Sequence, residues 1–127
     1  MALNVSFKVV LLDGGGRVLL GRNPRQEWEL LGGRPDLIDA SPQDALRREL
    51  LEEAGIAIAV GPLLDSWIYD LGELGRICIV TYLAAPAADA SLLVSEEHSD
   101  LRWFTPEEAL DAPMPQGYKN SIAAATR

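Results

Sequence analysis

Three glutamates in the middle of the chain have the spacing of a metal-binding cluster on one helix face. Glu49, Glu52 and Glu53 stand at positions i, i+3 and i+4, and at about 100° per residue this spacing brings their carboxylates to one side of a helix. They fall in the last two turns of the predicted helix, where the negative end of the helix dipole disfavours carboxylates. A hard divalent cation such as Mg²⁺ or Mn²⁺ prefers oxygen ligands and would offset this cost. The spacing therefore predicts a site for such a cation.

The same spacing also fits a simpler interpretation, in which the three carboxylates form a solvated acidic face. Arg47 and Arg48 would then neutralise part of its charge. Arg48 stands four residues before Glu52, close enough on a helix to hold that carboxylate. It is therefore suited to orienting a ligand rather than to binding a metal. Spacing alone leaves both interpretations open.

A pair of glycines followed by an arginine precedes this helix. Gly32 and Gly33 lack side chains, so the backbone there can approach a ligand or an ion closely. Arg34 offers a guanidinium group that could contact a phosphate. Most glycine pairs are turns, so these three residues are candidates for substrate binding only in combination with the helix.

Taken together, these segments resemble the signature of the Nudix hydrolase family, with its MutT-like pyrophosphohydrolases. The signature reads Gly, five residues, Glu, seven residues, then Arg-Glu-aliphatic-x-Glu-Glu-x-Gly-aliphatic. Residues 48–56, Arg-Glu-Leu-Leu-Glu-Glu-Ala-Gly-Ile, match its second half at every fixed position. Residues 28–33 resemble its lead-in, and residues 97–104 are similar to the segment before the late helix of the family. The resemblance covers nearly the whole chain.

The first half of the signature differs at one position. Counting back seven residues from Arg48 reaches Ala40, where the family has a glutamate, whereas Asp39 is separated from Gly33 by five residues. A one-residue insertion, with Asp39 in the role of that glutamate, is the simplest explanation. The resemblance implies that this residue supports the loop and the arginine, Arg48, more than it binds metal. Leu31 also replaces the proline that often precedes the glycines.

The resemblance implies metal-dependent hydrolysis of the pyrophosphate bond in a nucleoside diphosphate linked to another moiety. A nucleoside triphosphate, an ADP-ribose-like compound or a nucleotide sugar would each fit. By carry-over, Glu49 and Glu53 would bind Mg²⁺ or Mn²⁺ directly, and Glu52 directly or through water. Glu52 and Arg48 would thus belong to the catalytic machinery.

The resemblance also implies a general base from a glutamate outside the signature. Glu96 and Glu97 are the candidates, and Glu97 is preferred because it directly precedes the His98–Phe104 segment. A second reading from another class is a Nudix-fold module that binds a nucleotide or sugar nucleotide without hydrolysing it. Such modules tend to lose signature carboxylates, and all three are present here, which favours the enzyme; Asp39 favours the module.

An α+β fold is the predicted frame for these residues, and the resemblance implies an α/β/α sandwich with a central mixed β-sheet. The main helix is predicted over residues 42–54, with Ser41 as N-cap and Gly55 as C-terminal stop. No repeat or linker interrupts the chain, so a single domain over residues 1–127 is expected. The predicted strands cover residues 3–12, 17–21, 28–31, 56–60, 63–70, 76–84 and 101–104. Residues 105–108 are predicted to open a second, shorter helix, and a final helix is predicted over residues 118–125.

Composition narrows the choice of partners. The chain has 19 acidic and 11 basic residues among 127, a net charge of -8, and such a polyanion repels nucleic acid and anionic membranes. A small nucleotide is still acceptable if a cation bridges the two. The single cysteine, Cys78, and the lack of a leader or of an apolar run of about 18 residues predict a cytoplasmic protein without membrane contact. A homodimer through the sheet or the late helices stays open.

Overall fold

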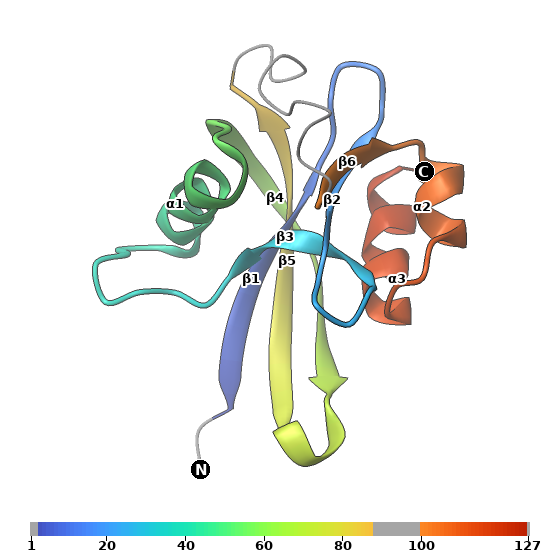
Figure 1. Cartoon of the computed structure of the whole chain (residues 1–127). Coiled ribbons are helices and arrows are strands. Elements are labelled where there is room, and N and C mark those ends of the chain that lie inside the picture. The colour runs from blue at the N-terminus through green and yellow to red at the C-terminus, as the bar shows by residue number, and fades with distance from the viewer. Residues whose placement is uncertain (1–2, 88–99, 127) are drawn as a thin grey trace.

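The computed structural model describes residues 3–87 and 100–126, and its centre is a six-stranded sheet (Figure 1). The strands follow the order β4-β5-β1-β3-β2-β6. β1 runs parallel to β5, and the other neighbouring pairs are antiparallel, so the sheet is mixed. The strand bounds are β1 (Asn4–Leu11), β2 (Val18–Arg22), β3 (Trp28–Gly33), β4 (Ile58–Asp70), β5 (Arg76–Pro86) and β6 (Leu101–Phe104).

Helices cover both faces of this sheet, which confirms the predicted α/β/α sandwich. α1 (Pro42–Ala54) lies on one face, and α2 (Pro106–Asp111) and α3 (Gln116–Ala125) lie on the other (Figure 1). Each face has its own buried apolar cluster, one built around α1 and one around α2 and α3. No helix in the described ranges is long and apolar enough to cross a membrane.

The ends of α1 follow the local sequence closely. The Ser41 side chain accepts a hydrogen bond from the backbone N–H of Asp44 at 3.1 Å, and Pro42 occupies the first turn. Gly55 adopts a left-handed conformation with φ 67°, in which its N–H bonds the last helical carbonyls. The buried apolar face of α1 consists of Ala45, Leu46 and Leu50. The glutamates of the signature consequently lie away from the core.

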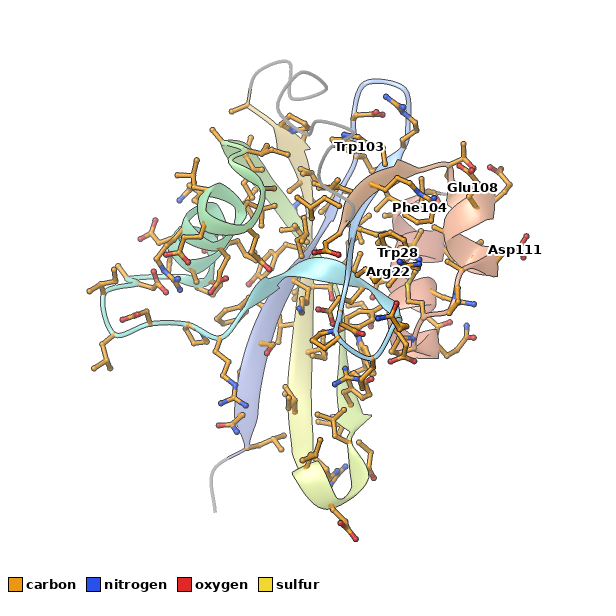
Figure 2. The ribbon with its side chains drawn as sticks, viewed as in Figure 1. Arg22, Trp28, Trp103, Phe104, Glu108 and Asp111 are labelled. Carbon is orange, nitrogen blue, oxygen red and sulfur yellow. The ribbon has the colours of Figure 1, made fainter. Side chains whose placement is uncertain are left out.

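The opposite face is anchored by aromatic residues (Figure 2). Trp28 of β3 and Phe104 of β6 meet edge to face with ring centroids 4.8 Å apart. The guanidinium of Arg22 lies 5.1 Å from the Trp28 ring, so that a cation covers the outer side of this pair. The contact ties the start of β3 to the α2 side of the sheet.

Two predicted strands form one in the structure. The sequence predicts separate strands over residues 56–60 and 63–70. β4 instead runs from Ile58 to Asp70, and its pairing with β5 is irregular between Val60 and Asp65. β4 is an edge strand, where a proline without an N–H is tolerated.

Candidate functional site

The glycine pair forms the end of β3 and lies directly beside β1. Gly32 is opposite Lys8 and Gly33 is opposite Phe7 in the antiparallel register. Gly32 has φ 140°, and a Cβ at this position would overlap the carbonyl oxygen of Phe7. Only glycine fits here, because both the conformation and the space exclude a side chain.

Two of the three glutamates converge on these glycines from α1. A Cβ on Gly33 would lie 2.9 Å from the carboxyl carbon of Glu49, so the missing side chain makes room for that carboxylate. The Gly32 N–H donates a hydrogen bond of 3.2 Å to Oε2 of Glu53. Glu49 and Glu53 thus approach adjacent residues of one strand end, as the predicted shared face requires.

The Glu53 carboxylate has an unfavourable electrostatic setting. Although the residue as a whole is exposed, its carboxyl end lies against the sheet. Desolvation there is the main cause that raises the pKa of Glu53 to about 7, and the charges of Glu49 and Glu29 add to it. Lys8 and the Gly32 N–H act in the opposite direction.

Arg48 connects the remaining acidic groups. Its Nε and Nη2 donate to Oδ1 and Oδ2 of Asp39 at 3.0 and 2.8 Å, a bidentate pair. Its Nη1 lies 3.2 Å from both Glu49 Oε1 and Glu52 Oε2. Nη2 also donates to the carbonyl of Arg34 at 3.4 Å. One guanidinium therefore orients the helix carboxylates and holds the β3–α1 loop.

The one-residue insertion does not separate Asp39 from this arrangement. The Asp39 side chain is only 5% exposed, and the hydrogen bond from Arg48 is the main cause that lowers its pKa. The same pair raises the pKa of Arg48. Asp39 is thus held ionised on Arg48, the contact that the insertion hypothesis requires.

Asp39→Asn is expected to lower hydrolytic turnover about 10- to 100-fold, the range typical of residues that orient ligands. The asparagine cannot form the doubly charged bidentate pair, so the guanidinium loses its fixed orientation beneath Glu49 and Glu52. Steady-state kinetics on the purified variant measure the effect. Asp44→Asn is the matched control, because it breaks a 2.9 Å pair with Arg47 on the same helix. Equal activities of the two variants would contradict this role for Asp39.

A hard divalent cation suits this set of oxygen donors. Glu49 and Glu53 lie side by side on the glycine strand end, and the 59% exposed side chain of Glu52 is on the solvent side of Arg48. In the described ranges, no three acidic, histidine or cysteine side chains already converge as a metal cage. Arg48 instead occupies the space between Glu49 and Glu52, so these carboxylates would have to turn from it toward a cation. The predicted base, Glu97, and its alternative, Glu96, lie outside the described residues.

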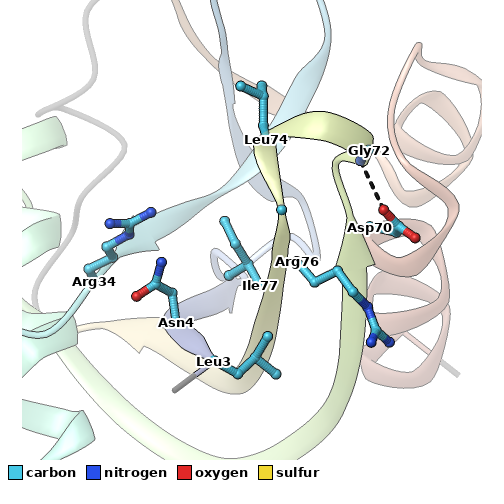
Figure 3. Close-up of a pocket in the computed structure, with 9 residues that line it drawn as sticks. Leu3, Asn4, Arg34, Asp70, Gly72, Leu74, Arg76 and Ile77 are labelled. Carbon is cyan, nitrogen blue, oxygen red and sulfur yellow. Dashed lines mark hydrogen bonds between the residues drawn. The ribbon is translucent and has the colours of Figure 1, made fainter. Parts of the chain in front are cut away.

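Arg34 lines a cleft of about 550 Å³. The cleft lies between the start of β1 and the turn that joins β4 to β5. Figure 3 shows Asn4 and Arg34 on one side of it and Arg76 on the other. Arg34, which directly follows Gly33 in the chain, is the one residue of the β3–α1 loop among the described residues that line this cleft.

Two charged residues near Glu53 were not identified from sequence. Lys8 and Glu29 both act on the Glu53 carboxylate, and both belong to strands rather than to the signature. The sequence feature that could have identified Lys8 is its position as a charged residue within a run of strand-forming residues, Val5-Ser6-Phe7-Lys8-Val9. Their proximity depends on the pairing of β1 with β3, which the sequence does not specify.

Known proteins resemble this chain over most of its length. The family model of the NUDIX domain matches residues 2–125. The CTP pyrophosphohydrolase of Escherichia coli is 35% identical over 115 residues, which cover 87% of this chain and 82% of that protein. The solution structure of the E. coli ORF135 protein has a TM-score of 0.69 at 28% identity, with 97% of this chain and 89% of that one covered.

A further structural relative is NrtR of Shewanella oneidensis. Its NUDIX domain, solved with ADP ribose, has a TM-score of 0.75 at 22% identity, with coverage of 98% of this chain and 87% of that one. NrtR was also solved with a 27mer DNA (TM-score 0.77, 22% identity); there the match covers 95% of this chain and 59% of that one. At this identity the likeness shows a shared fold.

Proposed function

Because this chain belongs to the Nudix family and is a hydrolase of pyrophosphate bonds in nucleotide derivatives, we propose that it acts with a divalent cation, Mg²⁺ or Mn²⁺, held by Glu49, Glu52 and Glu53. The observation that carries the proposal is the convergence of Glu49 and Glu53 on Gly33 and Gly32. This arrangement collects the negative charge of two carboxylates at one strand end, where they would serve as ligands for a phosphate-bound cation.

In this mechanism the residues of the chain bind and orient the substrate. Arg48 holds the carboxylates of Glu49 and Glu52 in place, and Gly33, by lacking a side chain, makes room for the Glu49 carboxylate. Glu49, Glu52 and Glu53 would hold the divalent cation, which would supply neutralisation of charge on the diphosphate and a lowered pKa of the attacking water. Glu97 is the proposed general base that accepts a proton from the attacking water. Arg34 is assigned to the part of the nucleotide beyond the scissile bond, because it leads from the glycines into the adjoining cleft.

A nucleoside triphosphate is the first substrate class to test, and CTP is the first member because a 35% identical relative is named for it. The assay measures release of the nucleoside monophosphate from a panel of nucleoside triphosphates, ADP-ribose and nucleotide sugars. The second product is pyrophosphate from a triphosphate and a sugar phosphate from the other two classes. We expect a small-molecule nucleotide as the only partner required for turnover. Faster turnover of one of these three classes would identify the substrate class.

Removal of divalent cations is expected to abolish turnover, and the addition of Mg²⁺ or Mn²⁺ should restore it. Without a cation the carboxylates repel one another and the substrate at a helix C-terminus. The same addition should raise the melting temperature, since a cation that binds only the folded state stabilises it. Turnover that persists in excess chelator would contradict the proposed metal site.

A binding module is the second candidate function, favoured by the NUDIX domain solved with ADP ribose. This alternative predicts that ADP-ribose raises the melting temperature while no panel member is hydrolysed with either metal. Turnover of any panel member that requires Glu53 would decide for the enzyme.

A further inference from the structure

Lys8 is a charged residue in a buried position that the proposed mechanism does not use. It lies in the middle of β1 with only 8% of its surface exposed. Its neighbours across the sheet are Gly32 of β3 and Thr81 of β5. Burial of an ammonium group is costly unless a partner compensates for it, so its presence here requires an explanation.

The protein supplies little compensation for this charge. Within residues 3–87 and 100–126, no carboxylate lies within 4.0 Å of the Lys8 ammonium. Its closest recorded contact is the Tyr118 ring of α3, with Nζ 5.9 Å from the ring centroid. A cation–π contact at this distance is weak. Among the described residues, the ammonium thus has no direct ion-pair partner, and Glu53 acts on it only at longer range.

Two further donors around Tyr118 share this property. The Thr81 hydroxyl is fully buried beside Lys8, and the indole Nε1 of Trp67, whose ring packs against Tyr118 at 5.2 Å, is buried as well. Neither atom has a hydrogen-bond partner in the part of the chain that the structure covers. Buried polar groups are nearly always paired. The Thr81 hydroxyl and the Trp67 indole N–H are enclosed in the core, whereas the Lys8 Nζ is not among the fully buried unpaired atoms. Of these three donors, the ammonium is therefore the one that a ligand oxygen could reach.

This region is continuous with the proposed active site. Gly32, opposite Lys8, donates its N–H to Glu53, and Lys8 lies within electrostatic reach of the Glu53 carboxylate. Lys8, which faces Tyr118 of α3, and Glu53, which comes from α1, thus meet at Gly32 from the two faces of the sheet.

We propose that Lys8 is a substrate-binding residue whose ammonium donates to an acceptor oxygen of the nucleotide from the α3 side of the sheet. The inference rests on the proposed function, because it places the nucleotide across Gly32. The oxygen belongs either to the diphosphate or to the base and sugar, and both share the chemistry that a lysine recognises.

The test compares Lys8→Met with wild type, with Lys119→Met as the control at the only other lysine. The ligand is a methylene-bridged CTP analogue that cannot be hydrolysed, titrated calorimetrically with Mn²⁺ present. We expect Lys8→Met to bind the analogue at least about tenfold more weakly, the size of one charge-assisted hydrogen bond. Lys119→Met should bind as wild type does, and Lys8→Arg should recover part of the affinity.

A purely structural role would give a different pattern. If Lys8 served only to balance nearby carboxylates, its removal would change Mn²⁺ binding without nucleotide and lower the melting temperature. The proposal instead expects a melting temperature that is unchanged or higher, since methionine suits an apolar surrounding. It also expects Mn²⁺ binding that is unchanged or tighter, since a positive charge is removed.

A second ligand distinguishes the two oxygen sources. Methylenediphosphonate carries the diphosphate without base or sugar. Weaker binding of both ligands to Lys8→Met assigns the contact to the diphosphate, and weaker binding of the CTP analogue alone assigns it to the base or sugar. Unchanged affinity for both ligands, or a loss explained by weaker Mn²⁺ binding, overturns the inference. If the wild-type protein binds no nucleotide, both the proposed function and this inference are overturned. If the wild-type protein turns over a nucleotide normally and Lys8→Met binds both ligands as tightly as wild type, the inference alone is overturned.

Discussion

Glu53→Gln is expected to reduce turnover of the best nucleotide by about 10³-fold, the loss typical when a group that stabilises developing charge is removed. The amide keeps an oxygen that can accept the Gly32 N–H bond, so the local geometry should persist. It cannot, however, supply the negative charge that the proposed cation requires. Steady-state kinetics over a range of Mg²⁺ concentrations measure the loss.

The fold of this variant should be intact. The substitution removes a charge that lies near Glu49 and Glu29, so the melting temperature without metal should be equal to or above that of wild type. Glu73→Gln, in the exposed turn between β4 and β5, is the matched control and should retain full activity. Near-normal turnover by Glu53→Gln would remove Glu53 from the metal site.

Gly32→Ala is expected to destabilise the whole protein by about 3 kcal/mol, because a strained φ and a steric overlap act together. The new Cβ would meet the Phe7 carbonyl oxygen, part of the β1–β3 ladder, at φ 140°. For a chain of this size such a loss lowers the melting temperature by about 10 °C. Thermal unfolding by circular dichroism measures the shift.

Two other glycines provide the comparison. Gly14 in the β1–β2 turn has nothing within 4 Å of an added Cβ, so Gly14→Ala should change the stability by less than about 0.5 kcal/mol. At Gly33 the added Cβ would meet the end of the Glu49 side chain at 2.9 Å, which can move. Gly33→Ala should therefore keep the fold but displace Glu49 and lower activity. Equal melting temperatures of Gly32→Ala and Gly14→Ala would refute the close approach of Gly32 to the Phe7 carbonyl.

The elements with strong local signals were predictable from sequence. The bounds of α1 followed from Ser41, Pro42 and Gly55, because caps and helix stops act within one turn. The contact between Asp39 and Arg48 could be anticipated by counting residues against the signature. β4 was harder, because whether Gly61-Pro62 breaks a strand depends on its place at the sheet edge.

The features that depend on strand register were not predictable. That Glu53 reaches the N–H of Gly32, and that Lys8 lies opposite the same glycine, follows from which residue of β1 faces which residue of β3. A shift by one residue would turn Lys8 to the other face. The final helix also begins at Gln116 rather than at residue 118, and helix starts without a capping side chain give little local signal.

The placement of β1 between β3 and β5 has a consequence for how the chain folds during synthesis. β1 meets β3 within a short stretch of chain, but Leu11 pairs with Ala84, so its second neighbour emerges only after β4 and most of β5 have been translated. Pairings of such sequence separation are slow to form, and an unpaired strand edge is a template for wrong partners. The glycine pair and α1 are therefore complete in sequence long before β5 can close the sheet. We expect the nascent chain to be most prone to misassembly in that interval.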